Sequence, residues 1–475
     1  MKTSRASSSP NLIFFLVDQL RLQSCGYAGD KLAHTPSIDW LASNGMSFVN
    51  AVSSDPVCGP YRASLMTGKY PSTTGMVINE MRANPHHECI GHVLARAGYQ
   101  TAYIGKWHLW SNKTEGENLA ENGFVPPGPA RMGFDGHWAA YNFNFDYFHA
   151  NYFLDGGERI IADDYETEFT TKLGIDWLCS REPGRPFALF LSFGPPHDPW
   201  EWSNVPQHFA ERFSGVEFPF PITYRDGSAE YWEPSMDKEW WMTTVKPNLS
   251  KWQAVYSAMV ASADEACGKL LKHLRDHDLL HDTLFVFTSD HGEMFGAHGR
   301  MAKNIFYEEA VRVPFLVHWA GRIKPGSKCF ECLGTPDIMP TLLGALDLEI
   351  PPGVEGMDLS GHIKEEQGPV KNEILLQGMG HTWLWLDGFE WRGLRTKRFT
   401  YAIERVNGVE YLFDNSIDPL QQHNLAHDRL HSHAKEYIKE SMQTKMSELN
   451  DEFRECSWYG KHWTKDRIVL RGAKG

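Results

Sequence analysis

The segment SSDPVCGPYRASLMTGKYPS, residues 53–72, places Cys58 two residues before Pro60 and four residues before Arg62. The residues that follow Arg62 have helical character, and proline suits the first position of a helix, where its missing N–H costs no hydrogen bond. Cys58 is therefore expected at the positive end of a helix dipole, beside a guanidinium that cannot lose its charge. Such surroundings favour a thiolate or a bound anion, so Cys58 could be a nucleophile, a structural thiol or the precursor of another group.

Other polar residues stand at the ends of short apolar runs that are typical of buried strands. We expect these strands at residues 11–18, 101–107, 187–193, 283–290 and 313–319. The polar groups at or just after the first four strands are Asp18, Gln19, Lys106, His108, His197, Asp290 and His291. Ligand sites in parallel sheets lie beyond the carboxyl ends of the strands, so we predict that these side chains meet at one edge.

The types of these residues indicate two kinds of chemistry. Two carboxylates, an amide carbonyl and an imidazole suit a hard divalent cation, and the imidazole also tolerates Mn²⁺. The other groups are Lys106, His108 and His197, to which Lys303 is added. They offer hydrogen bonds to the oxygens of an anion and side chains for proton transfer. An aspartate at a strand end is often only a helix cap, but packing alone does not explain polar groups at so many strand ends.

The predicted fold class is α/β, with a large, mostly parallel sheet covered by helices on both faces. Helical patterns separate the strands, at residues 37–44, 60–68, 90–98, 165–179 and 252–277. After residue 370 we expect short antiparallel strands at 373–377, 391–396, 399–403 and 410–413, then a charged helix at 428–453. We therefore predict a catalytic domain at 1–370 and a smaller C-terminal α+β domain at 371–475 that completes the active-site cleft. Residues 200–252 fit no regular element.

Composition excludes several functional classes. The chain is globular in composition, with 42% hydrophobic and 22% charged residues, and its net charge of −14 argues against nucleic acid as a partner. No run approaches the roughly 20 apolar residues that span a membrane, and the N-terminus lacks the order of a signal peptide. A cytoplasmic protein and a secreted or periplasmic one without its leader fit equally well. The eight cysteines show no disulfide spacing.

The sequence around Cys58 resembles a known signature. Cys58-Gly-Pro60-Tyr-Arg62 is similar to the C-x-P-x-R motif of the type I sulfatases, in the alkaline phosphatase superfamily. Further similar segments follow in family order over nearly the whole chain: FFLVDQLR (14–21), GYQTAYIGKWHL (98–109), GPPHDP (194–199), SAMVASADEACGKLL (257–271), FTSDHGE (287–293), RVPFLVHWAG (312–321) and YLFDNSIDPLQQHNLA (411–426).

The resemblance implies an unusual nucleophile and a metal. Cys58 would be oxidised by a formylglycine-generating enzyme, and the hydrate of the resulting formylglycine would attack the sulfate ester. The residues that match the family's metal ligands are Asp18, Gln19, Asp290, His291 and residue 58 itself. Ca²⁺ is the expected ion. Gln19 and His291 stand where many members have Asp and Asn, so Mn²⁺ is the alternative.

The resemblance also implies roles for the cationic groups. Arg62 matches the arginine that holds the diol, and the sulfate-binding and proton-transfer groups match Lys106, His108, His197 and Lys303. His108 would be the base that collapses the sulfated intermediate, whereas His197 and Lys303 would assist the leaving oxygen. Arg300 is the alternative to Lys303 for the same sulfate-binding role.

The expected substrate is a sulfated saccharide. The insertion after His197 is expected near the mouth of the pocket and carries Trp200, Trp202, Trp232, Trp240 and Trp241. Trp383 and Trp385 of the second domain, close to His381, would complete a sugar-sized cleft, and we name Trp200, Trp241, His381 and Trp383 as its sugar-binding residues. Such indoles could instead stabilise the insertion. The alternatives are a phosphonate monoester or phosphodiester hydrolase, a choline-sulfatase-like enzyme and a non-catalytic binding protein. The sequence does not reveal the sugar, the sulfate position, exo or endo action, or the oligomeric state.

Overall fold

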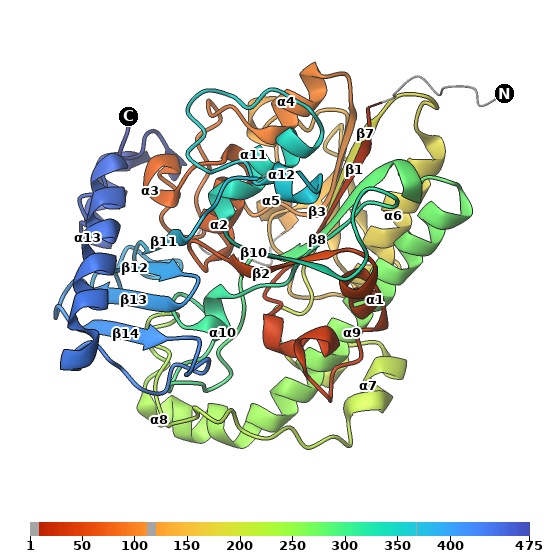
Figure 1. Ribbon diagram of the computed structural model, residues 1–475. Helices are drawn as coiled ribbons and strands as arrows, with labels where there is room; N and C mark the ends of the chain where they lie inside the picture. The colour runs from red at the N-terminus through yellow and green to blue at the C-terminus, as the bar shows by residue number, and fades with distance from the viewer. Residues whose placement is uncertain (1–8, 112–119, 367) are drawn as a thin grey trace.

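The computed structural model describes residues 9–111, 120–366 and 368–475. Its centre is a ten-stranded sheet in the order β10-β2-β9-β8-β1-β7-β3-β4-β5-β6 (Figure 1). The strands are β1 Asn11–Val17, β2 Met46–Val52, β3 Gln100–Lys106, β4 His137–Tyr141, β5 Asn151–Leu154, β6 Arg159–Ile161, β7 Phe187–Phe193, β8 Thr283–Ser289, β9 Phe315–His318 and β10 Ser327–Gly334.

The sheet is buried on both faces because the middle positions of its central strands form nearly continuous apolar runs. In β1, Phe14 and Leu16 pack into one hydrophobic cluster, whereas Phe15 and Val17 point into another on the opposite face. This alternation follows from the two-residue period of a strand. A continuous apolar run therefore needs helices on both faces.

Helices cover both faces of the sheet (Figure 1). Helices α2, α4 and α11 contribute to the first cluster, and α1, α6, α7 and α9 to the second. The helices are α1 Pro36–Asn44, α2 Cys58–Thr67, α3 Pro71–Thr74, α4 Ile90–Arg96, α5 Ala120–Gly123, α6 Glu166–Ser180, α7 Gln207–Phe213, α8 Lys238–Trp240, α9 Lys246–Asp276, α10 Glu308–Val311, α11 Thr335–Ala345, α12 Ser360–Ile363, α13 Ser432–Glu448 and α14 Cys456–Trp463. The predicted α/β class is confirmed.

Several strands of the large sheet were not predicted from the sequence. The central strands β8, β1, β7, β3 and β4 are parallel, but β9 runs antiparallel to both β8 and β2, and β5 and β6 are antiparallel at one edge. Strands β4, β5 and β6 were not predicted because they are short, and β2 and β10 were not predicted because polar residues interrupt their apolar runs. In residues 200–252, short helices and a π-helical turn at Trp241–Val245 precede α9.

The C-terminal region forms a second, four-stranded antiparallel sheet in the order β11-β12-β13-β14, as predicted. Its strands are β11 Glu373–Gly378, β12 Trp391–Thr396, β13 Phe399–Glu404 and β14 Glu410–Asp414. One face packs α13 through Leu375 and Leu412. The other face packs Leu376 and Trp391 against Phe306 of the larger part of the chain. The boundary at residue 370 remains a prediction.

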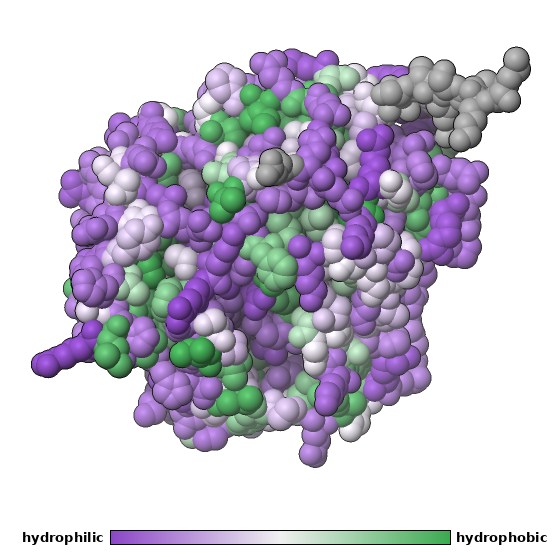
Figure 2. Space-filling model, in the orientation of Figure 1, coloured by the Kyte–Doolittle hydropathy of each residue, from purple (hydrophilic) through white to green (hydrophobic). Residues whose placement is uncertain are grey.

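The surface carries both hydrophilic and hydrophobic side chains. On the face shown in Figure 2, hydrophilic side chains dominate and hydrophobic ones form small, separate groups. Within the residues that the structure describes, no helix has both the length and the apolar character needed to cross a membrane.

A buried ion pair joins the C-terminal sheet to helix α10 of the larger part of the chain. The Arg395 guanidinium on β12 contacts the Glu308 carboxylate at the start of α10 through Nε–Oε1 at 3.1 Å and Nη2–Oε2 at 3.2 Å. Both side chains are almost fully buried. Arg395→Met should lower the free energy of unfolding by about 3–5 kcal/mol, because Glu308 keeps its charge and loses its main partner. Urea denaturation checks this value.

The double variant Arg395→Met/Glu308→Gln is the control for this pair. It removes the stranded charge, so it should be more stable than Arg395→Met alone. If both variants unfold at the same urea concentration as the unaltered protein, the pair does not hold the C-terminal sheet against α10.

Candidate active site

Two carboxylates meet at the ends of neighbouring strands. Strands β1 and β8 pair in parallel with Val17 opposite Ser289, so the next residues, Asp18 and Asp290, lie side by side at the carboxyl edge. Both carboxylates are fully buried. The predicted meeting of strand ends is confirmed for this pair.

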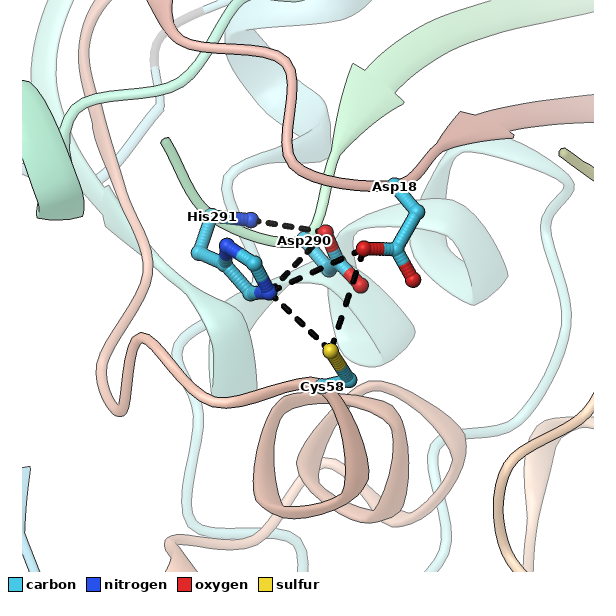
Figure 3. A group of neighbouring side chains, drawn as sticks. All are labelled: Asp18, Cys58, Asp290 and His291. Carbon is cyan, nitrogen blue, oxygen red and sulfur yellow. Dashed lines mark hydrogen bonds and ion pairs between the residues drawn. The ribbon is translucent and has the colours of Figure 1, made fainter. Parts of the chain in front are cut away.

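Cys58 is the first residue of α2, which places Pro60 at the third helical position and not at the predicted first one. Its Sγ lies 3.1 Å from His291 Nε2 and 3.8 Å from Asp18 Oδ1 (Figure 3). Burial and the Asp18 carboxylate raise the pKa of the thiol to about 12, and the nearby Lys303 and Lys106 offset this only in part. The site therefore favours the neutral thiol over a thiolate, first because burial disfavours the charged form and then because the Asp18 carboxylate faces the sulfur.

The side chains of Asp18, Cys58, Asp290 and His291 converge on one point (Figure 3). One donor atom from each lies within 4.8 Å of all the others. His291 Nδ1 donates to the Gly292 carbonyl at 3.0 Å, which leaves the lone pair of Nε2 for a ligand. Two carboxylates and one imidazole nitrogen fit a divalent cation.

Gln19 joins this group with a defined orientation. Its backbone is left-handed, with φ 63°, and its Oε1 accepts a hydrogen bond from Lys303 Nζ at 2.7 Å. Its Nε2 donates to Glu293 Oε2 at 2.7 Å, so the carbonyl of the amide is the group that faces the site. Glu293 lies within the motif FTSDHGE, but its hydrogen bond to the Gln19 amide was not predicted from the sequence.

Arg62 neutralises both carboxylates. Its Nη2 lies 3.1 Å from Asp18 Oδ2 and 3.2 Å from Asp290 Oδ2. Its Nη1 donates to Ser192 Oγ at 2.7 Å, a residue that sequence reasoning missed. Lys106, the last residue of β3, adds a second cation, with Nζ 2.8 Å from Asp18 Oδ2. Two cations therefore balance two buried anions.

His197 and Lys303 form a second polar pair. Lys303 Nζ donates to His197 Nε2 at 2.9 Å. His197 Nδ1 lies 3.1 Å from the Asp198 carbonyl oxygen and 3.1 Å from Asp198 Oδ1, so Nδ1 carries the proton in the neutral ring. Burial and the charges of Lys303 and Lys106 hold the pKa of His197 well below its usual range. Arg300, the alternative to Lys303, lies outside this pair, with its guanidinium over the Tyr231 ring.

His108 is held by its backbone and by an aromatic neighbour. Its backbone is left-handed, with φ 57°. Its ring packs against Phe143 in a T-shaped arrangement, with the two ring centroids 4.3 Å apart. Neither ring nitrogen has a hydrogen-bond partner within the described part of the chain. Burial, Lys106 and Arg62 hold the pKa of His108 well below its usual range. The Glu80 carboxylate lies close to this ring, with Oε1 3.7 Å from His108 Nε2.

The extreme C-terminal segment reaches this part of the site. Arg467 Nε donates to the Glu80 carbonyl at 2.9 Å, and Arg467 Nη2 donates to Ser111 Oγ at 2.8 Å. Ser111 Oγ in turn donates to Glu80 Oε2 at 2.9 Å. Sequence reasoning missed Glu80 and Arg467, because no local pattern links residues 387 positions apart.

These groups open into a cleft of about 400 Å³. Its floor carries Lys106, His108, His197 and Lys303, and its aromatic walls are Phe143, Phe145, Trp232 and Trp383. Three carboxylates, from Glu80, Asp198 and Glu233, also line it. The cleft has the size of a small-molecule site and can hold one anionic group at its floor.

Of the four predicted sugar-binding residues, only Trp383 lines this cleft. Trp241 is fully buried and donates from Nε1 to Tyr224 OH at 3.2 Å, and Trp200 packs on Phe295 with ring centroids 4.8 Å apart. His381 is 1% exposed, and its Nδ1 accepts the backbone N–H of Leu384 at 3.1 Å. These three side chains are buried outside the lining of the cleft, the two indoles by the packing of the insertion, and a contact between them and a sugar stays a prediction.

The chain matches known proteins over most of its length. A model of the sulfatase family matches residues 10–348, and a model described as N-sulphoglucosamine sulphohydrolase, C-terminal, matches residues 296–452. The chain is 32% identical to an ulvan-active sulfatase of Formosa agariphila over 469 residues, 96% of this chain and 84% of that one. An endo-4-O-sulfatase of Bacteroides thetaiotaomicron is 28% identical, with 98% and 96% covered. The solved structure of a sulfatase named yidJ from Bacteroides fragilis has a TM-score of 0.82 and 27% identity, with 97% and 99% covered.

The contacts of Arg62 predict how stability depends on a cation. Arg62→Met should destabilise the cation-free protein by about 3–5 kcal/mol, because Asp18 and Asp290 lose a shared partner. Added Ca²⁺ should therefore raise the melting temperature of the variant more than that of the unaltered protein. Thermal denaturation in EDTA and in CaCl₂ measures both effects.

Arg96→Met is the matched control, because the Arg96–Glu88 ion pair is exposed. Its response to Ca²⁺ should equal that of the unaltered protein. An equal response in Arg62→Met would mean that Arg62 does not compensate the two carboxylates.

Proposed function

The chain belongs to the sulfatase family and is a sulfuric ester hydrolase, and we propose that it removes sulfate from a carbohydrate through a formylglycine derived from Cys58. The observation that carries the proposal is the convergence of Cys58, Arg62 and two buried carboxylates beneath a cationic cleft with aromatic walls. Each component suits one part of a sulfate ester: the reacting sulfur, its charged oxygens and the attached sugar.

The nucleophile is a modified Cys58 side chain. The thiol itself is neutral and buried, with a pKa of about 12, so it is a weak nucleophile near neutral pH. A formylglycine-generating enzyme is the partner that oxidises Cys58 to an aldehyde, which adds water to form a diol. One hydroxyl of the diol attacks sulfur, and the bond from sulfur to the sugar oxygen breaks. The other hydroxyl then loses its proton, the C–O bond to sulfate breaks, and sulfate leaves with the aldehyde restored.

The metal ligands are Asp18, Gln19, Asp290 and His291, together with residue 58, and the proposed ion is Ca²⁺, with Mn²⁺ as the alternative. The observation that supports this set is the donor arrangement, with two carboxylates, a carbonyl oriented by Glu293 and one imidazole nitrogen. A divalent cation there would polarise the sulfate oxygens and lower the pKa of a nearby hydroxyl. Arg62 and Lys106 contribute positive charge on the same side.

Two histidines have separate roles in proton transfer. His197 carries its fixed proton on Nδ1, toward Asp198, so Nε2 is the nitrogen that faces Lys303 and the cleft. In its neutral form His197 has no proton on Nε2, so the proton that the departing sugar oxygen takes up comes from the Lys303 ammonium and passes through His197 Nε2. His108 has free ring nitrogens among the described groups and serves as the base that collapses the sulfated diol.

A saccharide suits the walls of the cleft. Trp383 donates from Nε1 to the Trp232 backbone carbonyl at 2.8 Å, which fixes the Trp383 indole, and both residues line the cleft. Aromatic faces of this kind bind sugar rings through their apolar sides. Two relatives support the assignment by their names, one being active on ulvan and the other an endo-4-O-sulfatase.

Other ester substrates share part of this chemistry. The carboxylate of Glu233 beside Trp232 and Trp383 also suits a quaternary ammonium group, as in choline sulfate. Phosphate diesters and phosphonate monoesters carry the same single charge as a sulfate ester. A screen of sulfated saccharides beside choline sulfate, a phosphodiester and a phosphonate ester separates the candidates by kcat/KM.

The modified nucleophile has a direct test. Peptide mass spectrometry of active enzyme should find formylglycine or its hydrate at position 58, and thiols at the other seven of the eight cysteines. Cys58→Ala should abolish turnover with an unchanged circular dichroism spectrum, because only the nucleophile is lost. Full activity with an unmodified Cys58 thiol would refute the proposal.

The role of His197 predicts a dependence on the leaving group. His197→Ala should slow cleavage of sugar sulfates by about 10²–10⁴-fold, the usual contribution of a general acid, and slow nitrophenyl sulfate much less. A sugar oxygen needs a proton to leave, whereas nitrophenolate does not. Steady-state kinetics on both substrates measure the difference, and equal losses would make His197 a sulfate-binding group instead.

A further inference from the structure

A second hollow lies outside the catalytic cleft. It has a volume of about 460 Å³ and is lined by parts of three regions: the loop before α8 and α8 itself, the loop that carries Arg300, and the ends of β13 and β14. In Figure 1, α8 and β14 lie on the same side of the molecule. Three cationic side chains, Arg225, Lys238 and Arg300, line this hollow.

None of these three cations lies within ion-pairing distance of a carboxylate among the residues that the structure describes. The Arg300 guanidinium is fixed over the Tyr231 ring at 3.9 Å, and its buried Nε has no hydrogen-bond partner there. Arg225 and Lys238 are exposed. In a chain with a net charge of −14, three cations without carboxylate partners in one hollow form a local site for an anion.

The carboxylates around the hollow are engaged elsewhere or lie at its rim. Asp226 accepts from Tyr224 OH at 2.9 Å and lies 3.3 Å from Lys246 Nζ. Glu404 accepts from Asn407 Nδ2 at 2.7 Å and from Tyr411 OH at 2.8 Å. The Glu230 side chain is exposed. The cations therefore keep their hydrogen-bond donors available for a ligand.

The hollow and the catalytic cleft share two chain segments. The segment 230–238 contributes Glu230 and Lys238 to the hollow and Trp232 to the cleft. The loop that contributes Arg300 to the hollow contributes Lys303 to the cleft. Three residues of chain span at most roughly 11 Å, so the Cα atoms of these two residues lie within the reach of a short oligosaccharide.

We propose that Arg225, Lys238 and Arg300 bind a second anionic group, a sulfate ester or a carboxylate, on a saccharide whose reacting sulfate lies beside Lys303 and His197. This proposal rests on the proposed carbohydrate sulfatase function and extends it. The substrate is then an oligosaccharide with several negative charges, and affinity depends on a sugar other than the one that is desulfated. Arginine suits this task because its planar guanidinium can form two parallel hydrogen bonds to either anion.

The test compares three synthetic tetrasaccharides that share one cleavable sulfate. One carries a second sulfate, one carries a uronate carboxylate and one carries no other charge. The matured enzyme should show a lower KM for the two doubly charged compounds, and the compound with the lowest KM identifies the preferred group. Arg225→Gln and Arg300→Gln should each raise that KM about tenfold, as expected for a lost charge-assisted hydrogen bond, with kcat nearly unchanged.

Lys172→Gln is the matched control, because Lys172 is an exposed cation on α6, outside both the hollow and the cleft. It should leave every KM unchanged. Arg225 is exposed, so its substitution should leave the melting temperature unchanged even if Arg300→Gln lowers it by loosening Tyr231. The difference in KM between charged and neutral compounds should also shrink as salt is added.

Two negative outcomes have different meanings. Cleavage of all three tetrasaccharides with equal KM, unchanged in both arginine variants, would overturn the second site and leave the proposed function intact. Cleavage of nitrophenyl sulfate or a phosphodiester but of no saccharide would overturn the proposed function itself. Titration calorimetry with Cys58→Ala and the doubly sulfated tetrasaccharide measures binding without turnover, and an affinity about tenfold lower in Cys58→Ala/Arg225→Gln supports the site.

Discussion

Asp18 and Asp290 follow paired strands, so the central sheet itself forces two carboxylates together in a place that excludes water. Two such charges need compensation to remain ionised. The Arg62 guanidinium touches both. Because Arg62 lies one turn beyond Cys58 on α2, its ion contacts also hold the start of that helix against the strand ends, with the sulfur beside His291.

Backbone carbonyls orient the imidazoles around this charge cluster. His291 donates from Nδ1 to Gly292, and His197 directs Nδ1 to the Asp198 carbonyl, so both present Nε2 to the site. The two rings suit different ligands because the charges of their neighbours differ. His291 faces carboxylates and suits a metal, whereas His197 faces the Lys303 ammonium and suits an anionic substrate.

The upper part of the site comes from segments remote in sequence. Trp383 follows β11 in the C-terminal sheet, and it lines the cleft beside Trp232 from the insertion after β7. Arg467, from a hairpin near the end of the chain, holds the backbone of Glu80 beside His108.

Sequence patterns alone predicted the α/β class, the C-terminal antiparallel sheet and the polar groups at the strand ends, because apolar runs and the residues that end them are local features. Resemblance to the sulfatases added roles for Cys58, Arg62 and Lys303. Tertiary structure alone decided that Trp241 belongs to the core and Trp232 to the cleft, since burial depends on how the insertion packs on α9. It also decided the charge state of Cys58, because a pKa is set by neighbours that meet only when β1, β8 and α2 come together.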